Sequence, residues 1–509
     1  MKQNILIDSQ VLQTSAWKRG MGRYLISLIM GLSKIKEGPK LTLIFNKDLV
    51  LTRECRKILS KIAPDADLYF LQFAKGMSDL VEERNSRILD EFIEQNKLQS
   101  SIFVNGSIFT FDYQPAFPSL TINTCIFYDI IPYKHWNIFN RYFPAEEYSR
   151  RFKYIYKCEH IFAISKTVKN DLHNYFLIPE NKVTNISGAE IPHFLEHNDY
   201  LDSPLFSGRY VLLPGGDSPH KNMLRAIKAF DEFNSQFGDS LRLIITSYYS
   251  DENIERMNQL SSNIVLTGNI PENKLRSLYK NAELIIFPSI DEGLGLPLLE
   301  AVYYGRKVAC SDIPVFREIS SSAFYFFDPK NVQDIQRALM DAFVGIDWEH
   351  KLKAYNKIRE TFTWHETANR LLKALPGIII AAPKKNSFTQ SILVEQDYSL
   401  ETNKLVSGEV IRNGNLDKIT VYCDLLEDYA YNKTTPPFIF MYFLECKDIS
   451  DFVKSKSLRR SVIITPHSNL SIILGEKLEA QFVGDNKLRR KILREVTSSS
   501  HKERVADGT

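Results

Sequence analysis

The segment PSIDEGLGLPLLEA, residues 288–301, joins an apolar run to a helical pattern through a glycine-rich turn. The run Leu284–Phe287 before it predicts a strand. Pro297–Tyr304 predicts a helix whose proline suits the first turn, where its missing N–H costs nothing. Gly293 and Gly295 let the backbone approach a ligand closely, and the free N–H groups at the start of the helix can hold a phosphate. The segment therefore predicts a strand, a ligand-binding loop and a helix.

Two carboxylates flank this loop. Glu292 and Glu300 are eight residues apart, and Glu300 lies about one turn into the predicted helix. A carboxylate at that point suits the hydroxyl groups of a sugar or ribose, because it accepts hydrogen bonds from two donors. The structural alternative is that Glu292 caps a turn and Glu300 is a solvated helix residue. The glycine loop between them favours the functional interpretation.

The alternation of strands and helices continues on both sides of this segment and predicts an α/β unit with a parallel sheet. Such sheets bind ligands outside the carboxyl ends of their strands. The predicted strands are Tyr210–Leu213, Leu241–Thr246, Ile264–Thr267 and Lys307–Cys310, and the predicted helices are Met223–Phe233, Ile254–Leu260 and Glu272–Lys280.

A second loop, LPGGDSPHKN at residues 213–222, lies between the first strand and helix of this unit. Gly215 and Gly216 open the turn, and Lys221 offers a point charge for a diphosphate. The alternative is a plain helix N-terminus, capped by Asp217 or Ser218.

The first part of the chain predicts another α/β unit. Its predicted strands are Ile5–Ile7, Leu41–Phe45, Ile102–Val104, Cys125–Tyr128 and His160–Ile164, with helices within Gly20–Lys34 and Leu80–Asn96. The pattern breaks over residues 191–208, where polar residues and Pro204 predict a linker between the two units.

Three loops of the first unit carry candidate residues. KRGMGRY at residues 18–24 places Gly20 and Gly22 between the first strand and helix; its two arginines either bind an anion or are solvated. YDIIP at residues 128–132 ends a strand, and its aspartate, Asp129, has a polar role in the cleft or a structural role in a turn. Ser165 is expected to cap a helix rather than to contact a ligand.

Residues 288–301 resemble the donor-site signature of the retaining glycosyltransferases of family 4. Val308–Pro329 and Phe362–Leu375 resemble the strand, turn and helices that follow in that family, and the resemblance extends over residues 1 to about 375. It implies an α/β protein with the GT-B fold, in which two Rossmann-like domains face a cleft.

The resemblance divides the chain into four parts. Residues 1–195 are expected to form the acceptor domain, and residues 205–360 the nucleotide-sugar donor domain. Residues 361–375 are expected to form a closing helix that packs back on the first domain. We identify no family resemblance for residues 376–509; they are expected to form an extension of uncertain α+β structure with a disordered tail.

The resemblance also implies roles for residues. In the family, the residue at the position of Lys221 neutralises the leaving diphosphate. The residue at the position of Glu292 contacts a donor-sugar hydroxyl, and the one at the position of Glu300 holds ribose hydroxyls. Asp129 matches a position near the transferred sugar, and Glu292, Lys221 and Asp129 are the expected catalytic residues. The expected donor-binding set is Gly20, Gly22, Gly215, Gly216, His220, Lys221, Glu292, Gly293, Leu294, Gly295, Leu296 and Glu300.

Many family members carry an arginine where this chain has Gly216 or His220, so the histidine predicts pH-sensitive diphosphate binding. The implied activity is metal-independent hexosyl transfer with retention, without a cofactor. The donor is GDP-mannose or a dTDP- or UDP-sugar, and the acceptor is a glycan or lipid-linked glycan of a bacterial surface polysaccharide. The alternative is a non-catalytic GT-B scaffold or activating subunit. Asp65-Ala-Asp67 formally matches a metal motif, but we expect no metal there.

Composition adds little about partners. The formal net charge of +3 is too small to indicate a nucleic-acid partner. Six scattered cysteines and no apolar stretch approaching ~20 residues predict a soluble cytoplasmic protein, with peripheral contact at the inner face of the membrane left open. The basic stretch Lys487–Val496 could contact lipid or a partner, or be a solvated helix face.

Overall fold

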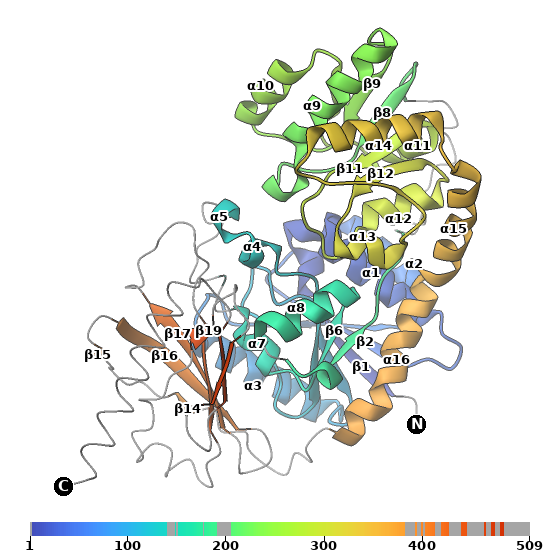
Figure 1. Cartoon of the computed structure of the whole chain (residues 1–509). Coiled ribbons are helices and arrows are strands. Elements are labelled where there is room, and N and C mark those ends of the chain that lie inside the picture. Colours follow the sequence, from blue (N-terminus) through green and yellow to red (C-terminus); the bar gives the residue numbers. More distant parts are fainter. Residues whose placement is uncertain are drawn as a thin grey trace, which may run out of the picture.

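The computed structural model describes residues 3–139, 148, 151–176, 178–190 and 205–381, together with short strands between residues 392 and 482. We call residues 3–190 the first unit and residues 205–361 the second unit. Each contains one parallel β-sheet, and Figure 1 shows the two units stacked with their helices around the sheets.

The sheet of the first unit has the order β3-β2-β1-β4-β5-β6-β7, and all of its strand pairs are parallel. This is the order of a Rossmann-like sheet. The strands are β1 Asn4–Asp8, β2 Lys40–Asn46, β3 Asp67–Leu71, β4 Ile102–Asn105, β5 Ile122–Phe127, β6 His160–Ala163 and β7 Val183–Asn185. The helices are α1 Gly20–Ser33, α2 Arg53–Ile62, α3 Asp79–Gln95, α4 Ile131–Lys134, α5 Trp136–Phe139, α7 Lys153–Tyr156 and α8 Lys166–Phe176.

The sheet of the second unit has the order β10-β9-β8-β11-β12-β13, again all parallel. Its strands are β8 Tyr210–Leu213, β9 Arg242–Ile245, β10 Ile264–Leu266, β11 Leu284–Phe287, β12 Lys307–Ser311 and β13 Tyr325–Phe327. Its helices are α9 Met223–Asn234, α10 Asp251–Leu260, α11 Glu272–Asn281, α12 Leu296–Tyr303, α13 Pro314–Ile319, α14 Val332–Val344 and α15 Trp348–Thr361. The central strands are apolar and fully buried, because helices cover both faces of a parallel sheet. The two predicted Rossmann-like sheets are therefore confirmed.

Helix α16 (Trp364–Ala381) leaves the second unit and runs along the first (Figure 1). The indole N–H of Trp364 donates to the carbonyl oxygen of Glu190 at 2.7 Å, and its ring packs edge-on against Tyr24 of α1. Gly31 allows this contact, because a Cβ there would lie 2.4 Å from the Trp364 carbonyl oxygen. The helix runs six residues beyond the predicted end at residue 375 and contains Pro376, which removes one helical hydrogen bond.

Helix α1 begins earlier than the sequence predicts. Two 3₁₀ turns, Gln10–Gln13 and Ser15–Lys18, follow β1, and Gly20 and Gly22 lie in the first turn of α1 rather than in a loop before it. The reason is close packing, since a Cβ on Gly22 would lie 2.2 Å from the Cα of Trp17.

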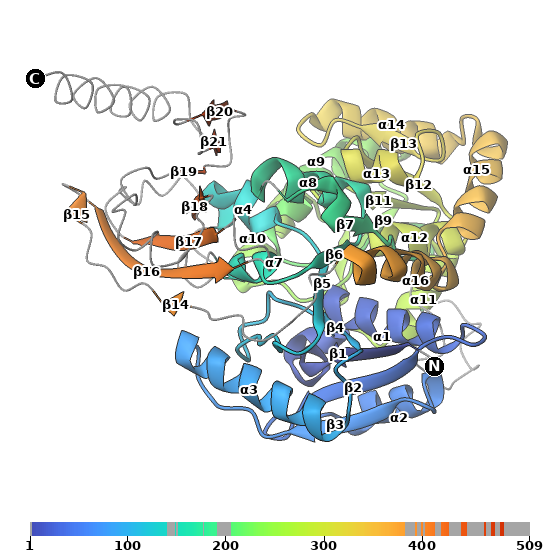
Figure 2. The same cartoon turned by 90° about the horizontal axis from the view of Figure 1, so that it is seen from below.

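Antiparallel strands follow α16: β14 Ile392–Leu393, β15 Ser399–Leu400, β16 Asn403–Arg412, β17 Ile419–Leu426, β18 Ile439–Leu444, β19 Ile463–Ile464, β20 Leu470–Ile473 and β21 Glu479–Phe482. Figure 2 shows β16 and β17 side by side. The sequence predicts strands in Thr389–Val394, Ile419–Leu425 and Ser461–Thr465, and β14, β17 and β19 overlap these three segments. The basic stretch at residues 487–496 and the tail lie outside the described residues. Among the described residues, no helix is both long and apolar enough to cross a membrane.

Candidate active site

The predicted loops meet where the carboxyl ends of the two sheets face one another. Gly293 follows β11 of the second unit, and a Cβ there would lie 2.7 Å from the carbonyl oxygen of Tyr128, which follows β5 of the first unit. The Tyr128 hydroxyl in turn donates to the carbonyl oxygen of Gly106, after β4, at 2.9 Å. The backbones of the two units therefore touch beside the predicted catalytic residues.

Lys221 and Glu292 form the centre of the site in the second unit. The Lys221 ammonium lies 2.6 Å from Glu292 Oε1, and the Ser289 hydroxyl donates to the same oxygen at 2.7 Å. Burial acts to raise the pKa of Glu292, but the charge of Lys221 and these hydrogen bonds outweigh burial and hold the pKa below its ordinary value. Glu292 is therefore ionised at neutral pH and is paired with Lys221, the residue predicted to bind the diphosphate.

Lys221 ends a 3₁₀ turn, Pro219–Lys221, that Asn222 anchors. Asn222 has a left-handed backbone (φ 56°), and its amide donates to the carbonyl oxygens of Pro288 at 3.0 Å and Pro329 at 2.7 Å. Asparagine tolerates this conformation better than most residues. The structural alternative, a cap at Asp217 or Ser218, does not hold for α9, since Asn222 occupies its cap position; Ser218 precedes the 3₁₀ turn instead.

His220 does not supply the positive charge of the arginine that the family resemblance leads us to expect near this position. Burial, followed by the charge of Lys221, lowers its pKa to about 4, so the imidazole is neutral at neutral pH. Its Nδ1 lies 2.8 Å from the Ser218 hydroxyl, and its backbone carbonyl accepts from the N–H of Ile290 at 2.8 Å. The predicted sensitivity to pH would therefore fall well below the physiological range.

Asp129 lies two residues beyond the end of β5 and faces the Glu292 loop. One carboxylate oxygen accepts the N–H of Ile131 at 3.0 Å, so the residue also shapes the start of α4. Burial, with smaller contributions from Asp291 and Glu292, raises its pKa to about 6. Both roles considered for Asp129, a turn former and a carboxylate in the cleft, are compatible with this geometry.

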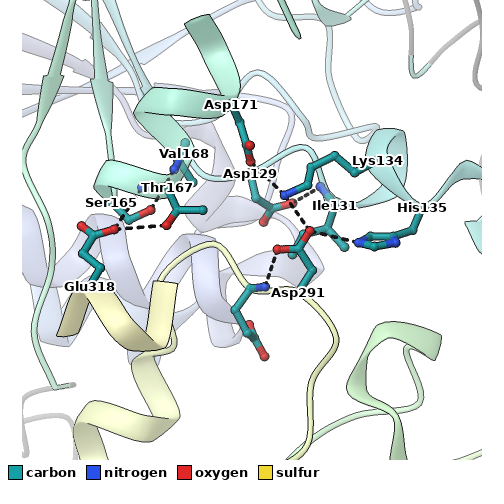
Figure 3. Close-up of polar contacts among 11 residues, drawn as sticks. Asp129, Ile131, Lys134, His135, Ser165, Thr167, Val168, Asp171, Asp291 and Glu318 are labelled. Carbon is teal, nitrogen blue, oxygen red and sulfur yellow. Dashed lines mark hydrogen bonds and ion pairs between the residues drawn. The ribbon is translucent and has the colours of Figure 1, made fainter. Parts of the chain in front are cut away.

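A polar cluster that the sequence analysis did not identify joins the two units next to Asp129 (Figure 3). Asp291 Oδ2 lies 2.7 Å from the Lys134 ammonium and 3.0 Å from His135 Nε2, both of the first unit. Asp291 Oδ1 accepts the backbone N–H of Glu292 at 2.9 Å. Lys134 also pairs with Asp171 of α8 at 3.2 Å. Only the adjacency of Asp291 to Glu292 could have pointed to this cluster in the sequence.

Glu300 is buried in α12 and faces Arg23 of the first unit. Arg23 Nη2 lies 3.6 Å from Glu300 Oε1 and 2.8 Å from Glu272 Oε1, so this arginine, considered as an anion ligand, already contacts two carboxylates. Burial is the main reason that the pKa of Glu300 rises to about 7, while Arg23 acts in the opposite direction.

The remaining predicted residues surround this centre. Gly295 has a left-handed backbone (φ 90°) before α12, and the side chain of Leu294 packs against Gly188 of the first unit. Pro297 lies in the first turn of α12, as predicted, and Leu296 begins that helix. Gly215 and Gly216 follow β8.

Ser165 caps α8, as predicted, by accepting the N–H of Val168 at 3.0 Å. Glu318 of the second unit completes this cap. Its carboxylate accepts the N–H of Thr167 at 3.0 Å (Figure 3) and that of Lys166 at 2.6 Å. Asp67, of the formal metal motif, begins β3 and pairs with Lys40 at 2.8 Å.

Comparison with known proteins places this geometry in a family. Residues 207–359 match the family described as glycosyl transferases group 1. The serotype-specific mannosyltransferase WbdA of Escherichia coli is 24% identical over 413 residues, which are 74% of this chain and 48% of that protein. The O-antigen chain mannosyltransferase RfbU of Salmonella typhimurium is 28% identical over 188 residues, 36% of this chain and 50% of that protein. The chain thus spans about half the length of these relatives.

Solved structures share the fold. A glycosyltransferase from Rickettsia africae ESF-5 superposes with a TM-score of 0.52 at 18% identity, covering 76% of this chain and 100% of the other. That likeness concerns the fold alone. Together with the match over residues 207–359, it shows that the second unit belongs to the glycosyl transferases group 1 family and that the chain has the GT-B fold.

Proposed function

We propose that this chain transfers a mannosyl residue from GDP-mannose to a glycan or lipid-linked glycan during synthesis of a bacterial surface polysaccharide. The observation that carries the proposal is the convergence of Lys221, Glu292 and Asp129. A cation and two carboxylates from three loops meet where the carboxyl ends of the two sheets face one another. This is the edge at which open α/β sheets bind ligands.

The second unit offers the donor subsite. Glu300 would accept hydrogen bonds from ribose hydroxyls. Lys221 and the N–H groups at the start of α12 would offset the charge that develops on the leaving diphosphate. Glu292 contacts Lys221 at 2.6 Å, so it would lie beside the diphosphate and accept a hydrogen bond from a hydroxyl of the donor sugar.

Gly215 and Gly216, which follow β8, favour a ligand that lies close to the backbone there. A Cβ on Gly215 or Gly216 would meet no protein atom closer than 3.5 Å, and neither residue has a positive φ. The fold itself therefore does not require glycine at either position. A ligand that approaches the backbone there gives the physical reason for both.

The first unit would supply the acceptor and Asp129. A carboxylate at this point favours the positive charge that develops on a sugar ring when its glycosidic bond breaks. Contact between the units would exclude water that otherwise hydrolyses the donor. Retention of configuration and independence of metal follow from the family resemblance, and we include them in the proposal.

The choice of mannose rests on the relatives, since WbdA and RfbU are both named mannosyltransferases. Of the three donor nucleotides that the sequence leaves open, GDP is therefore the first to test. The proposal assigns no role to the extension after α16.

The test measures thermal stabilisation by GDP, UDP, dTDP and CMP. A ligand at 100 times its Kd stabilises the protein that binds it by about 2.7 kcal/mol. We expect a shift with GDP for wild type that is absent from Glu300→Ala and retained in Glu349→Ala, which removes an exposed glutamate of α15. Each shift is taken relative to the same variant without nucleotide.

Turnover is then followed as GDP released from GDP-mannose, with and without a lipid-linked acceptor. A shift with UDP or dTDP alone would indicate that the donor is a UDP- or dTDP-sugar instead of GDP-mannose. Binding without turnover would favour the scaffold alternative. No shift with any nucleoside diphosphate would contradict the donor site itself.

A further inference from the structure

We infer that Lys134 is a positioning residue of the proposed reaction, which holds Asp291 across the interface between the two units and thereby sets the place of Glu292. The inference rests on the proposed function for its consequence on turnover. Its geometric part, a bridge that joins the two units, can be tested without any donor.

Asp291 has one oxygen for each side of the interface (Figure 3). Its Oδ2 faces the first unit, where it lies 2.7 Å from Lys134 Nζ and 3.0 Å from His135 Nε2. Its Oδ1 accepts the backbone N–H of the next residue, Glu292, at 2.9 Å. A shift of Asp291 therefore moves the backbone from which the Glu292 side chain extends.

Lys134 is held ready within its own unit. Asp171 of α8 lies 3.2 Å from its ammonium, so Lys134 keeps one ion pair when the units separate and gains the second when they meet. Burial acts against its charge, but the carboxylates of Asp171 and Asp291 outweigh burial and raise the pKa of Lys134 above its ordinary value. Lys134 is therefore charged at any pH at which the enzyme would be assayed.

Loss of either partner of the bridge should disturb the contact between the units. The side chains of Lys134 and Asp291 are only 18% and 10% exposed, so removal of one partner leaves the other charge poorly solvated. The same short segment places Asp129, since the Asp129 carboxylate accepts the N–H of Ile131 in the same helix, α4, that ends at Lys134. Lys134 thus holds Asp129 and Glu292 in place relative to each other, through helix α4 on one side and Asp291 on the other.

The consequence is a separation of binding from turnover. Glu300 and Lys221 of the second unit would bind the nucleotide, and neither contacts Lys134. Lys134→Met should therefore leave the GDP affinity within about twofold of wild type and lower kcat about 100-fold, the scale expected when reacting groups are displaced by ~1 Å.

The experiment compares Lys134→Met, Asp291→Asn, the double variant and the conservative Lys134→Arg. Lys40→Met is the matched control, because it removes a lysine from an ion pair of similar length, 2.8 Å to Asp67, inside the first unit. Three quantities are measured: Kd for GDP by calorimetry, kcat for GDP release from GDP-mannose, and the radius of gyration by small-angle X-ray scattering without ligand.

We expect the double variant to show the same increase in radius of gyration and the same loss of kcat as Asp291→Asn. Lys134→Met should show most of both effects, because His135 keeps its contact with Asp291 when Lys134 is removed. Lys134→Arg should recover most of the activity, and Lys40→Met should match wild type. Additive losses in the double variant, or a wild-type radius and kcat for Lys134→Met, would overturn the inference.

Failure of the proposed function has a different signature. Wild type would then neither bind GDP nor release it from GDP-mannose. In that case the radius of gyration alone decides: an increase common to the three bridge variants supports the bridge, and unchanged radii refute it. A variant that misfolds is recognised by a lower melting temperature, and the conclusion then rests on Lys134→Arg and Asp291→Asn.

Discussion

Gly293→Ala should separate the contact between the two units from the stability of either one. Gly293 does not have a positive φ, so alanine can adopt its backbone conformation without strain. The added Cβ would nevertheless lie 2.7 Å from the Tyr128 carbonyl oxygen and 3.2 Å from the Asp129 Cβ. Both of those atoms belong to the other unit. The clash therefore exists only while the units are in contact.

The size of the effect follows from the atoms that are crowded. A backbone carbonyl at the end of a buried strand yields little, and overpacking of this kind costs about 1–3 kcal/mol. The units can relieve it by moving apart, so the cost falls on the closed arrangement. At one decade per 1.4 kcal/mol, kcat for GDP-mannose turnover should fall about 5- to 150-fold.

The assay pairs this variant with Gly295→Ala, two residues along the same loop. Gly295 has φ 90°, and its added Cβ would lie 2.8 Å from Phe316 Cε1, inside the second unit. That variant should destabilise the second unit itself, through backbone strain of about 1–3 kcal/mol and the clash with the ring. We therefore expect a clearly lower melting temperature for Gly295→Ala and an almost unchanged one for Gly293→Ala.

The reasoning is refuted if Gly293→Ala lowers the melting temperature as much as Gly295→Ala does. It is equally refuted if Gly293→Ala keeps wild-type kcat and a wild-type radius of gyration. Either result would show that the units do not need this backbone contact.

Three further changes test the second unit. Lys221→Met leaves Glu292 without its partner at 2.6 Å; it should raise the pKa of Glu292 and weaken GDP binding at least about tenfold, measured by calorimetry. Asn222→Ala loses two buried hydrogen bonds and should cost about 2–4 kcal/mol in urea unfolding, with Asn222→Gly separating the left-handed backbone from the lost bonds. Burial lifts the pKa of Glu300 from 4.5 to about 7, so its contribution to stability is complete below about pH 4.5 and is lost as pH rises through about 7. Glu300→Gln should therefore gain stability relative to wild type between about pH 5 and pH 8, and a constant difference across that range would contradict the pKa.

The second unit was the easier one to predict. Its strands are short, apolar and buried on both faces, so they appear as continuous hydrophobic runs. Tyr210–Leu213 and Leu284–Phe287 were predicted to the residue. In the first unit, Asp67–Leu71 was missed, because it lies at the sheet edge, begins with a charged residue and is only partly buried.

The glycine-rich segment before α1 shows how packing overrides a local signal. Glycine disfavours a helix interior, so Gly20 and Gly22 predicted a loop. The close approach of the Trp17 backbone makes the second glycine necessary inside the helix instead. That contact joins residues of a 3₁₀ turn and a helix, and no periodicity in the sequence reports it.

Local sequence is enough to propose the residues that bind a phosphate and a sugar. Residue type and spacing along one strand–loop–helix segment are sufficient for that, since Glu292, the glycines and Glu300 all lie within nine residues. The pairing of these residues depends on contacts that form only in the folded chain. Lys134 and Asp291 are 157 positions apart in the sequence, and Arg23 and Glu300 are 277 positions apart. Each pair forms where the two units touch. Contacts between residues so far apart in the sequence depend on how the two domains pack. The charge state and position of the site residues therefore cannot be predicted from the local sequence pattern.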